Sequence, residues 1–248
     1  METELAFALS LADDADAIAL SRFRASDLRV ETKPDLTPVS EVDRAVEARL
    51  RERIAAERPG ERVLGEELGA DDGEGDRWIL DPIDATKNYV RGIPIWATLI
   101  ALEERVAVVS APALGRRWWG SAGCGAFCNG EEIRVSTIRR IEDGVVTTTS
   151  LRSGRERMRT LVDRAWSARG YGDFWQYMLV AEGSVEIAFD PGANLWDLAA
   201  PKLIVEEAGG RLTDLTGASR ADGGNAVASN GLLHDEALAA LAQGELTG

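Results

Sequence analysis

Two aspartates follow an apolar run that has the composition of a buried strand. Residues 78–80 lead into Asp81, a proline-containing step and Asp84, and an expected helix start follows at Ala85 and Thr86. Because proline cannot continue a central strand, we expect both aspartates on a turn at the end of a sheet. Paired carboxylates favour a hard divalent cation, and free amides at a helix start favour an anion. The stretch is typical of a site for a metal ion and a phosphate group.

Three further carboxylates stand where either chemistry or a plain structural role explains them. Glu66 follows a strand and a glycine, so it either projects into a pocket or is a solvated loop acid. Asp43 lies three residues after Ser40, which is the spacing of a helix capping box. Asp197 lies three residues after Asn194 and fits a helix cap equally well. The residues alone leave both interpretations open.

The elements that must position these residues alternate along the chain. We expect helices over residues 1–24, 40–58, 153–168, 174–182, 196–208 and 235–243, and strands over 62–65, 78–80, 96–102, 106–110, 145–149, 185–189, 211–214 and 226–229. Residues 31–39 should form an irregular arm, and residues 69–76 a flexible acidic loop. Alternation without repeats predicts a layered α/β or α+β architecture, and no linker separates any two lobes.

The bulk composition narrows the class of partner. A chain of 248 residues forms one large domain or two lobes. Its net charge of −14 argues against a nucleic-acid or anionic-membrane surface, although metals or amides can still favour a phosphate locally. No run approaches the roughly 18 apolar residues of a membrane span, and the N-terminus lacks the basic start of a signal peptide.

The cysteines do not indicate a metal centre. Cys124 and Cys128 lie in a glycine-rich region expected to be a turn, and His234 is the only histidine. Zinc would need two more soft ligands than this pair provides. We therefore expect reduced thiols in a cytoplasmic protein.

Several motifs, in order along the chain, resemble the inositol monophosphatase superfamily of Mg2+-dependent, lithium-sensitive phosphatases. Residues 65–67 resemble its GEE element, and residues 81–89 resemble DPIDGTxNF. Residues 196–200 with 207–210 resemble the WDxAA…EAGG signature, and residues 125–130 resemble the GAFxNG turn. The likeness spans nearly the whole chain.

The resemblance implies a fold and a domain organisation. The fold would be the layered αβαβα sandwich that this superfamily shares with fructose-1,6-bisphosphatases. Residues 1–248 would form a single phosphatase domain with two lobes. Approximately residues 1–140 would bind metal and phosphate, and residues 141–248 would bind the rest of the substrate. Relatives also imply a homodimer.

The same resemblance implies the metal ligands. Glu66, Asp81 and the carbonyl of Ile83 would bind one Mg2+, and Asp81, Asp84 and Asp197 would bind a second. A third, weaker ion would contact Glu66 through water. Two such ions stabilise the attacking and leaving oxygens of an in-line displacement, so no protein nucleophile is needed.

Catalysis and phosphate binding follow from the same motifs. Asp43 and Thr86 would orient and deprotonate the attacking water, with Glu66 acting through its ion, so the resemblance replaces capping as the expected role of Asp43. The amides of Ala85 and Thr86 would bind the phosphate. Ala85 stands where the family has glycine. With a negative φ the alanine would cost little, but with a positive φ we expect a weakened site.

Within the superfamily the chain most resembles histidinol-phosphatases of the actinobacterial type. The likeness is carried by residues 32–39, 110–119 and 171–174. It implies hydrolysis of histidinol phosphate in histidine biosynthesis. Asp84, Asp173 and Asp190 would face the leaving alcohol, where carboxylates suit a cationic amine; an N-cap explains Asp173 equally well.

Two other functions remain as alternatives. The first is the same chemistry on another small ester, such as inositol monophosphate or a nucleoside 3′,5′-bisphosphate. The second is a non-catalytic phosphate-binding protein in which Ala85 marks a decayed site. Against decay, all five carboxylates of the expected site are present, namely Asp43, Glu66, Asp81, Asp84 and Asp197.

Overall fold

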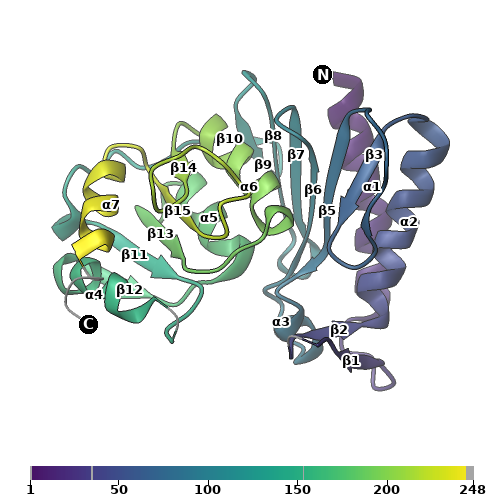
Figure 1. The fold of residues 1–248 in the computed structure, drawn as a ribbon, viewed down its shortest axis with the longest axis horizontal. Helices are drawn as coiled ribbons and strands as arrows, with labels where there is room; N and C mark the ends of the chain where they lie inside the picture. Colours follow the sequence, from purple (N-terminus) through teal and green to yellow (C-terminus); the bar gives the residue numbers. More distant parts are fainter. Residues whose placement is uncertain (1, 35, 153, 244–248) are drawn as a thin grey trace.

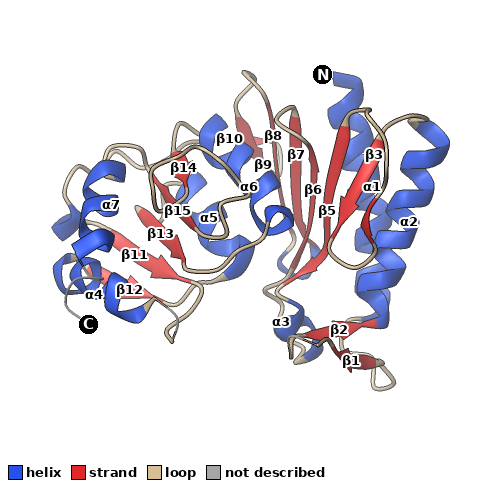
Figure 2. Cartoon of the chain, viewed as in Figure 1, coloured by secondary structure: helices blue, strands red, loops and turns tan. Residues whose placement is uncertain are grey.

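The computed structural model describes residues 2–34, 36–152 and 154–243, which stack in five layers of helix, sheet, helix, sheet and helix (Figures 1 and 2). Helices α1 (Glu2–Arg22) and α2 (Glu41–Glu57) cover one face of an eight-stranded sheet. Helices α5 (Asp173–Ala181) and α6 (Leu195–Glu207) lie between this sheet and a five-stranded one. Helices α4 (Arg155–Arg164) and α7 (His234–Gln243) form the outer layer. The expected layered α/β sandwich is confirmed.

The eight-stranded sheet is antiparallel except where β3 and β5 run parallel. Its strands, in spatial order, are β10 (Glu131–Ile133), β9 (Ala126–Cys128), β8 (Arg116–Ser121), β7 (Val106–Ala111), β6 (Ala97–Leu102), β5 (Arg77–Asp84), β3 (Arg62–Gly65) and β4 (Gly69–Ala70). The short helix α3 (Thr86–Val90) follows β5 directly. Strand β5 therefore lies inside the sheet, between β6 and β3.

The five-stranded sheet is mixed. Its strands, in spatial order, are β12 (Ser167–Arg169), β11 (Val145–Thr148), β13 (Ile187–Asp190), β15 (Ala226–Ser229) and β14 (Arg211–Thr213). The first three are mutually parallel, and β15 is antiparallel to both of its neighbours. Among the described residues, no helix is long and apolar enough to cross a membrane.

The expectation that the proline after Asp81 ends the strand is wrong. Strand β5 continues through Pro82 to Asp84, and its pairing with β6 shifts register between Asp81 and Asp84. Three steps along β5 there oppose two along β6, which is a β-bulge. The bulge accommodates a residue without an N–H, and the Pro82 carbonyl accepts a hydrogen bond from Thr98 Oγ1 at 2.8 Å.

Other expected boundaries also differ. The arm expected to be irregular contains a two-stranded hairpin, β1 (Val30–Thr32) and β2 (Pro38–Ser40). Residue 153, the expected start of a helix, lies outside the described residues; α4 ends at Arg164, and β12 follows where the helix was expected to continue. Strands β8 to β10 were not expected. Glycine-containing turns separate β8, β9 and β10, and the last two have only three residues each, so they show little periodicity.

Side chains along β5 point alternately to the two faces of the sheet, so they pack against two different helix layers. Trp78 and Leu80 pack with α1 and α2, in a cluster that includes Leu50 of α2. Ile79 packs on the opposite side with residues of α5 and α6, such as Leu198. Because strand residues two apart share a face, Asp81 is directed like Ile79, toward the central helices.

His234 is the single histidine of the chain, and it lies fully buried at the start of α7. Its Nε2 is 2.9 Å from Thr213 Oγ1, and its Nδ1 is 2.9 Å from Ser229 Oγ. Burial, helped by the charge of Arg211, lowers the pKa of His234 to about 4. The neutral ring is therefore the form that the folded protein holds.

We expect the one histidine signal in a proton NMR titration to stay constant from pH 8 to about pH 5.5, because the ring is buried and neutral. The unfolded chain binds this proton near the ordinary pKa of about 6.5. The free energy of unfolding should therefore fall as the pH drops from about 6.5 toward 4, by up to roughly 3 kcal/mol from this residue. A titration midpoint near 6.5 in the folded protein would contradict this account.

Candidate active site

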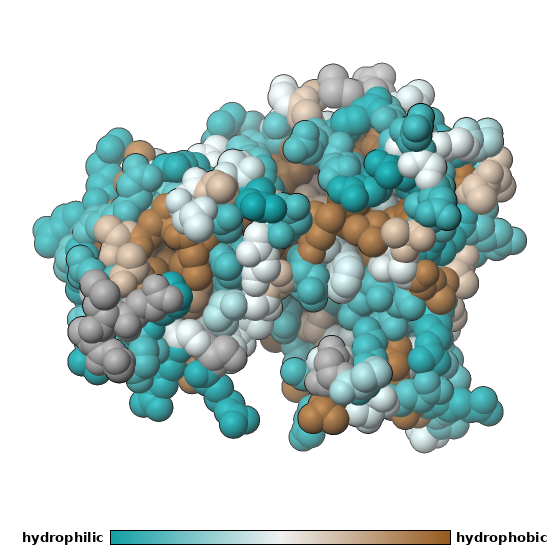
Figure 3. Space-filling view, viewed as in Figure 1, coloured by the Kyte–Doolittle hydropathy of each residue, from teal (hydrophilic) through white to brown (hydrophobic). Residues whose placement is uncertain are grey.

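A cavity of about 750 Å³ opens between the two sheets. It is bounded by the β1–β2 hairpin, the turn after β3, the end of β5 with α3, the loop after β11, and the segments that begin α5 and α6. The space-filling view shows the surface hollowed between α3 with the hairpin on one side and the five-stranded sheet on the other (Figure 3). All but one of the residues expected to act in binding or catalysis line this cavity; the exception is Asp43, which lies behind Thr86.

Three carboxylates meet at the floor of the cavity. One oxygen each from Asp81, Asp84 and Asp197 lies within 4.8 Å of the others. In a regular strand, residues 81 and 84 would face opposite sides, but the extra step of the bulge returns Asp84 to the face of Asp81. That face is covered by α6, whose first turn carries Asp197.

Burial and mutual repulsion act together on these acids. Burial raises the pKa of Asp81 well above its ordinary value, and the charges of Glu66, Asp84 and Asp197 raise it further. The pKa of Asp84 is also raised well above its ordinary value, first by burial and then by Asp173 and Asp197. The pKa of Asp197 is raised to about 7, mainly by burial. Like charges this close favour neutralisation by a proton or by a cation.

The donor set fits a hard cation. Asp81 Oδ1 is buried and has no hydrogen-bond partner in the described part of the chain. A buried carboxylate oxygen without a partner is costly, whereas a divalent ion would satisfy it. Every candidate ligand here is an oxygen, as Mg2+ or Ca2+ requires.

Asp43 and Asp197 both cap helices, so the capping interpretation is confirmed for both residues, including Asp43, for which the family resemblance had replaced it. Capping leaves one oxygen of each carboxylate for a role in the site, which stays a prediction. Asp43 Oδ2 accepts bonds from the Ser40 N–H at 2.9 Å and Ser40 Oγ at 2.5 Å, completing the capping box of α2. Its Oδ1 is 3.2 Å from Thr86 Oγ1. Asp197 Oδ2 accepts the Asn194 N–H at 2.6 Å and caps α6. In each residue, one carboxylate oxygen accepts the capping hydrogen bonds of its helix. The first turn of the helix thereby fixes where the side chain lies in the site.

Thr86 lies at the junction of these groups. Its Oγ1 is 3.0 Å from the Ile83 carbonyl as well as 3.2 Å from Asp43 Oδ1. Burial raises the pKa of Asp43, and its bonds to Ser40 oppose that effect. A hydroxyl that bridges a raised-pKa carboxylate and the open cavity is placed to relay a proton.

Glu66 lies where the sequence placed it, after β3, and it has a partner that was not expected. Lys33 of the hairpin reaches across to Glu66 Oε1 at 2.7 Å and to Glu67 Oε1 at 2.5 Å. Burial lowers the pKa of Lys33, but hydrogen bonds to both glutamates outweigh it and raise that pKa above its ordinary value. Lys33 was noted only within a segment of family likeness, and no local pattern connects it to residues 33 positions away.

The wall toward the second sheet carries two more acids. Thr149 Oγ1 donates to Asp190 Oδ2 at 2.8 Å, and Tyr177 OH lies 3.4 Å from the same oxygen. Asp173 begins α5, after Gly172 as the N-cap, and its carboxylate accepts no hydrogen bond from the described residues. Burial and the neighbouring charge of Asp190 raise the pKa of Asp173 to about 6. The charge of Lys87, which also lines the cavity, opposes this effect. Asp173 thus presents to the cavity a carboxylate that has no hydrogen-bond partner among the described residues.

The start of α5 also holds a metal-site candidate in place. The N–H of Phe174 donates to Asp84 Oδ2 at 2.6 Å, across 90 residues of sequence. Asp173, the residue before this amide, has a positive φ of 56°. The sequence marked Asp173 and Asp84 separately, but only the fold brings them together.

Ala85, between β5 and α3, has φ 64° and ψ 44°. This is the left-handed region, in which an L-residue with a Cβ is strained by roughly 1–2 kcal/mol. Because φ is positive, the expectation that applies to Ala85 is the one of a strained backbone and a weakened phosphate site. The backbone is held as a glycine would hold it, because the bulge on one side and α3 on the other determine its path.

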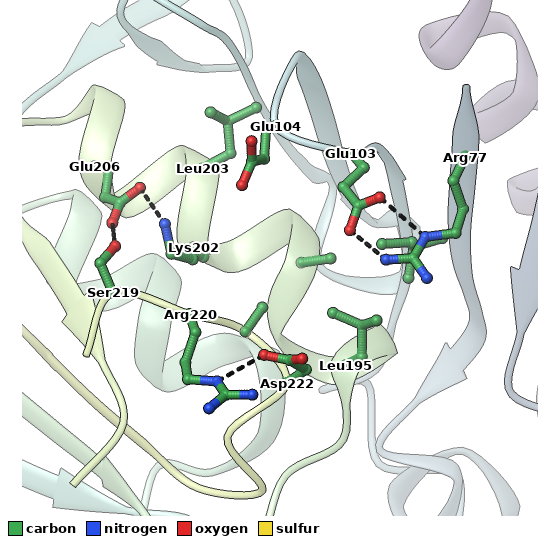
Figure 4. A pocket seen from close by; sticks show the side chains of 13 residues that line it. Arg77, Glu103, Glu104, Leu195, Lys202, Leu203, Glu206, Ser219, Arg220 and Asp222 are labelled. Atoms are coloured by element: carbon green, nitrogen blue, oxygen red, sulfur yellow. Dashed lines mark hydrogen bonds and ion pairs between the residues drawn. The ribbon is translucent and has the colours of Figure 1, made fainter. Parts of the chain in front are cut away.

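A second hollow, of about 400 Å³, lies on the other side of α6 beside the start of β5 and the loop over residues 219–222 (Figure 4). Six of its seven charged lining side chains form ion pairs, Arg77 with Glu103, Lys202 with Glu206, and Arg220 with Asp222, and Glu104 is the exception among the described residues. It therefore lacks the crowded like charges that distinguish the larger cavity.

Comparison with known proteins agrees with this geometry. Residues 1–246 match the model of the inositol monophosphatase family. The chain is 52% identical to a histidinol-phosphatase from Mycobacterium tuberculosis over 97% of this chain and 98% of that protein, and 48% identical to one from Streptomyces coelicolor over 97% of each. Among solved structures, the IMPase of Thermotoga maritima aligns with a TM-score of 0.90 at 31% identity, covering 99% of both chains. The chain belongs to the inositol monophosphatase family and is a phosphatase.

Proposed function

We propose that this chain hydrolyses L-histidinol phosphate to L-histidinol and inorganic phosphate, as a step of histidine biosynthesis. The observation that carries the proposal is the acidic cavity, which joins a buried carboxylate cluster to the carboxylate of Asp173. The carboxylate cluster is suited to metal-assisted phosphoryl transfer, and the carboxylate of Asp173 is suited to a cationic leaving group. Two relatives named histidinol-phosphatase, near 50% identity over nearly their full length, support the same substrate.

The metal sites proposed are those of the family resemblance. Glu66, Asp81 and the Ile83 carbonyl would hold one Mg2+, Asp81, Asp84 and Asp197 a second, and Glu66, through water, a third and weaker ion. When bound, the ions supply positive charge that neutralises the phosphoryl oxygens. The cluster of oxygens and the unpartnered Asp81 Oδ1 support this assignment.

The protein's own groups would handle the water and the phosphate. The attacking water would give a proton to Thr86 Oγ1 while Thr86 passes its own to Asp43 Oδ1, along the 3.2 Å contact. The raised pKa of Asp43 supports its role as the acceptor. The amides of Ala85 and Thr86, at the start of α3, would receive the phosphate.

Recognition of the leaving group would fall to Asp84, Asp173 and Asp190. Histidinol carries an ammonium group, for which carboxylates are better partners than for a neutral polyol. Approximately residues 1–140 would then act as the lobe for metal and phosphate, and residues 141–248 as the lobe for the alcohol, with Asp197 reaching back into the metal cluster. From the family resemblance we also propose a cytoplasmic homodimer, which light scattering on the purified protein would test.

The substrate assignment predicts a charge-specific effect at Asp173. The wild type should release phosphate faster from histidinol phosphate than from inositol 1-phosphate. Asp173→Asn should raise KM for histidinol phosphate by about tenfold, because one charge-assisted hydrogen bond to the ammonium is lost. Its kcat/KM for the uncharged-alcohol ester should stay within about twofold.

The matched control is Asp163→Asn on α4, whose side chain is 70% exposed beside Arg159. Control and wild type should behave alike with both esters. Faster wild-type turnover of inositol 1-phosphate would overturn the histidinol assignment in favour of an inositol monophosphatase, the name that a 32% identical relative from Mesorhizobium japonicum carries. No release from any ester at millimolar Mg2+ would favour a binding protein.

The metal assignment predicts that replacing Asp81 stabilises the metal-free protein and abolishes its stabilisation by Mg2+. In chelator, Asp81→Asn should raise the free energy of unfolding by about 1 kcal/mol or more, because it removes one of several crowded buried charges. Millimolar Mg2+ should raise the Tm of the wild type but not that of the variant. Calorimetric melts with and without Mg2+ measure both effects, and an equal Mg2+ shift in the two proteins would contradict the assignment.

Ala85 offers a gain-of-function test. Ala85→Gly should relieve the left-handed strain and raise the free energy of unfolding by roughly 0.5–1 kcal/mol after the added backbone entropy is subtracted. It should also raise kcat/KM, because no methyl group then stands beside the bound phosphate. Steady-state kinetics and denaturant titrations measure the two effects separately. An unchanged kcat/KM would show that alanine does not weaken the site.

A further inference from the structure

Glu47 is a fully buried carboxylate in the middle of α2, and it is not among the residues that line the catalytic cavity. Burying a charged side chain in a helix is costly unless strong hydrogen bonds satisfy it. Three donors do so here. The N–H of Glu67 lies 2.8 Å from Oε2, and the N–H of Leu68 and Nε of Arg51 lie 3.1 and 2.8 Å from Oε1.

Two of these donors are successive backbone amides of the turn that carries Glu66. On the other side of that turn, Gly65 lies so close to Glu47 that a Cβ added there would be 2.0 Å from Oε1. Glycine at 65 is therefore required by this carboxylate and not by its own dihedral angles. Glu47 contacts the chain both before and after Glu66.

The backbone of Glu66 is held from the opposite side as well. Its N–H donates to the Leu80 carbonyl of β5 at 3.2 Å, one residue before Asp81. Glu47 of α2 binds the amides of the two residues after Glu66, and β5 binds the amide of Glu66 itself. The backbone of Glu66 is therefore fixed relative to Asp81. Its side chain is then directed into the cavity, where Lys33 meets it.

We propose that Glu47 is a positioning residue for the metal site, acting through the turn at residues 65–68 to hold Glu66 at a set distance from the carboxylates of β5. The inference rests on the proposed metal-binding role of Glu66. Arg51 extends the same frame, because it bridges Glu47 to Asp71 Oδ1 at 2.7 Å. Removing a group that hydrogen-bonds to and orients metal ligands typically lowers metal affinity by roughly 10- to 100-fold.

The test compares Glu47→Gln with Glu52→Gln, a control on the same helix whose side chain is 71% exposed and pairs with Arg49. The side-chain amide of glutamine would place an NH2 group against the N–H donors that now bind the carboxylate, so the hydrogen bonds that fix the turn at residues 65–68 should weaken. Isothermal titration with Mn2+ should show Kd raised about tenfold or more in Glu47→Gln and unchanged in Glu52→Gln. The Mg2+ concentration for half-maximal activity should rise in parallel, with KM for the ester nearly constant at saturating Mg2+.

A second measurement needs no variant. In the wild type, the amides of Glu67 and Leu68 should exchange with deuterium far more slowly than that of the exposed Asp72. Rapid exchange at both amides, or a folded Glu47→Gln with wild-type Mn2+ affinity, would overturn the proposal. Because Mn2+ binding and exchange are measured without substrate, they stand even if histidinol phosphate proves to be the wrong ester.

Discussion

Repulsion among three carboxylates, two at the end of β5 and one in the first turn of α6, dominates the energetics of the acidic cavity. Asp81, Asp84 and Asp197 lie within 4.8 Å of one another, and burial raises the pKa of each. Such a cluster persists in a folded protein only if the surrounding elements are stable enough to hold it. Strand β5 lies inside the eight-stranded sheet, with a hydrophobic core cluster on each of its faces. The same repulsion favours the binding of a divalent cation at this cluster, which is the basis of the metal-assisted reaction that we propose.

The fold holds these acids with the caps of its own helices. Asp43 and Asp197 each complete a capping box with one oxygen while belonging to the site, and the N–H of Phe174 at the start of α5 holds Asp84. Glu47 extends the pattern, because it uses a buried carboxylate to bind the amides beside Glu66. Helix ends offer unpaired amides, and this protein uses them to orient the acidic side chains. Stability of the helices and geometry of the site are therefore coupled.

The two walls of the cavity divide the chemistry. The first sheet and its hairpin supply Glu66, Lys33 and the aspartates of β5, while the second sheet with α5 supplies Asp173 and Asp190. A phosphate ester bridging the walls would meet metals on one side and acids on the other. Under the proposed function, the wall of the second sheet would be the part that distinguishes a cationic alcohol from a neutral one. Substrate choice can thus change there without disturbing the metal cluster.

The layered α/β class could be predicted from the residues alone, because alternating helix and strand patterns reflect local periodicity. The carboxylates of the candidate site could also be predicted, because each lies in a short contiguous motif. The residue pattern placed Asp81 and Asp84 on a turn, however, since a proline in an internal strand is rare; only pairing with β6 showed the bulge that brings both to one face. Three features could not be predicted and became visible only in the folded chain: the positive φ of Ala85, the ion pair of Lys33 with Glu66, and the hydrogen bonds of Glu47 to the turn beside Glu66. These features depend on contacts between residues 20 or more positions apart or on a backbone path imposed from both sides, and no local pattern records such contacts.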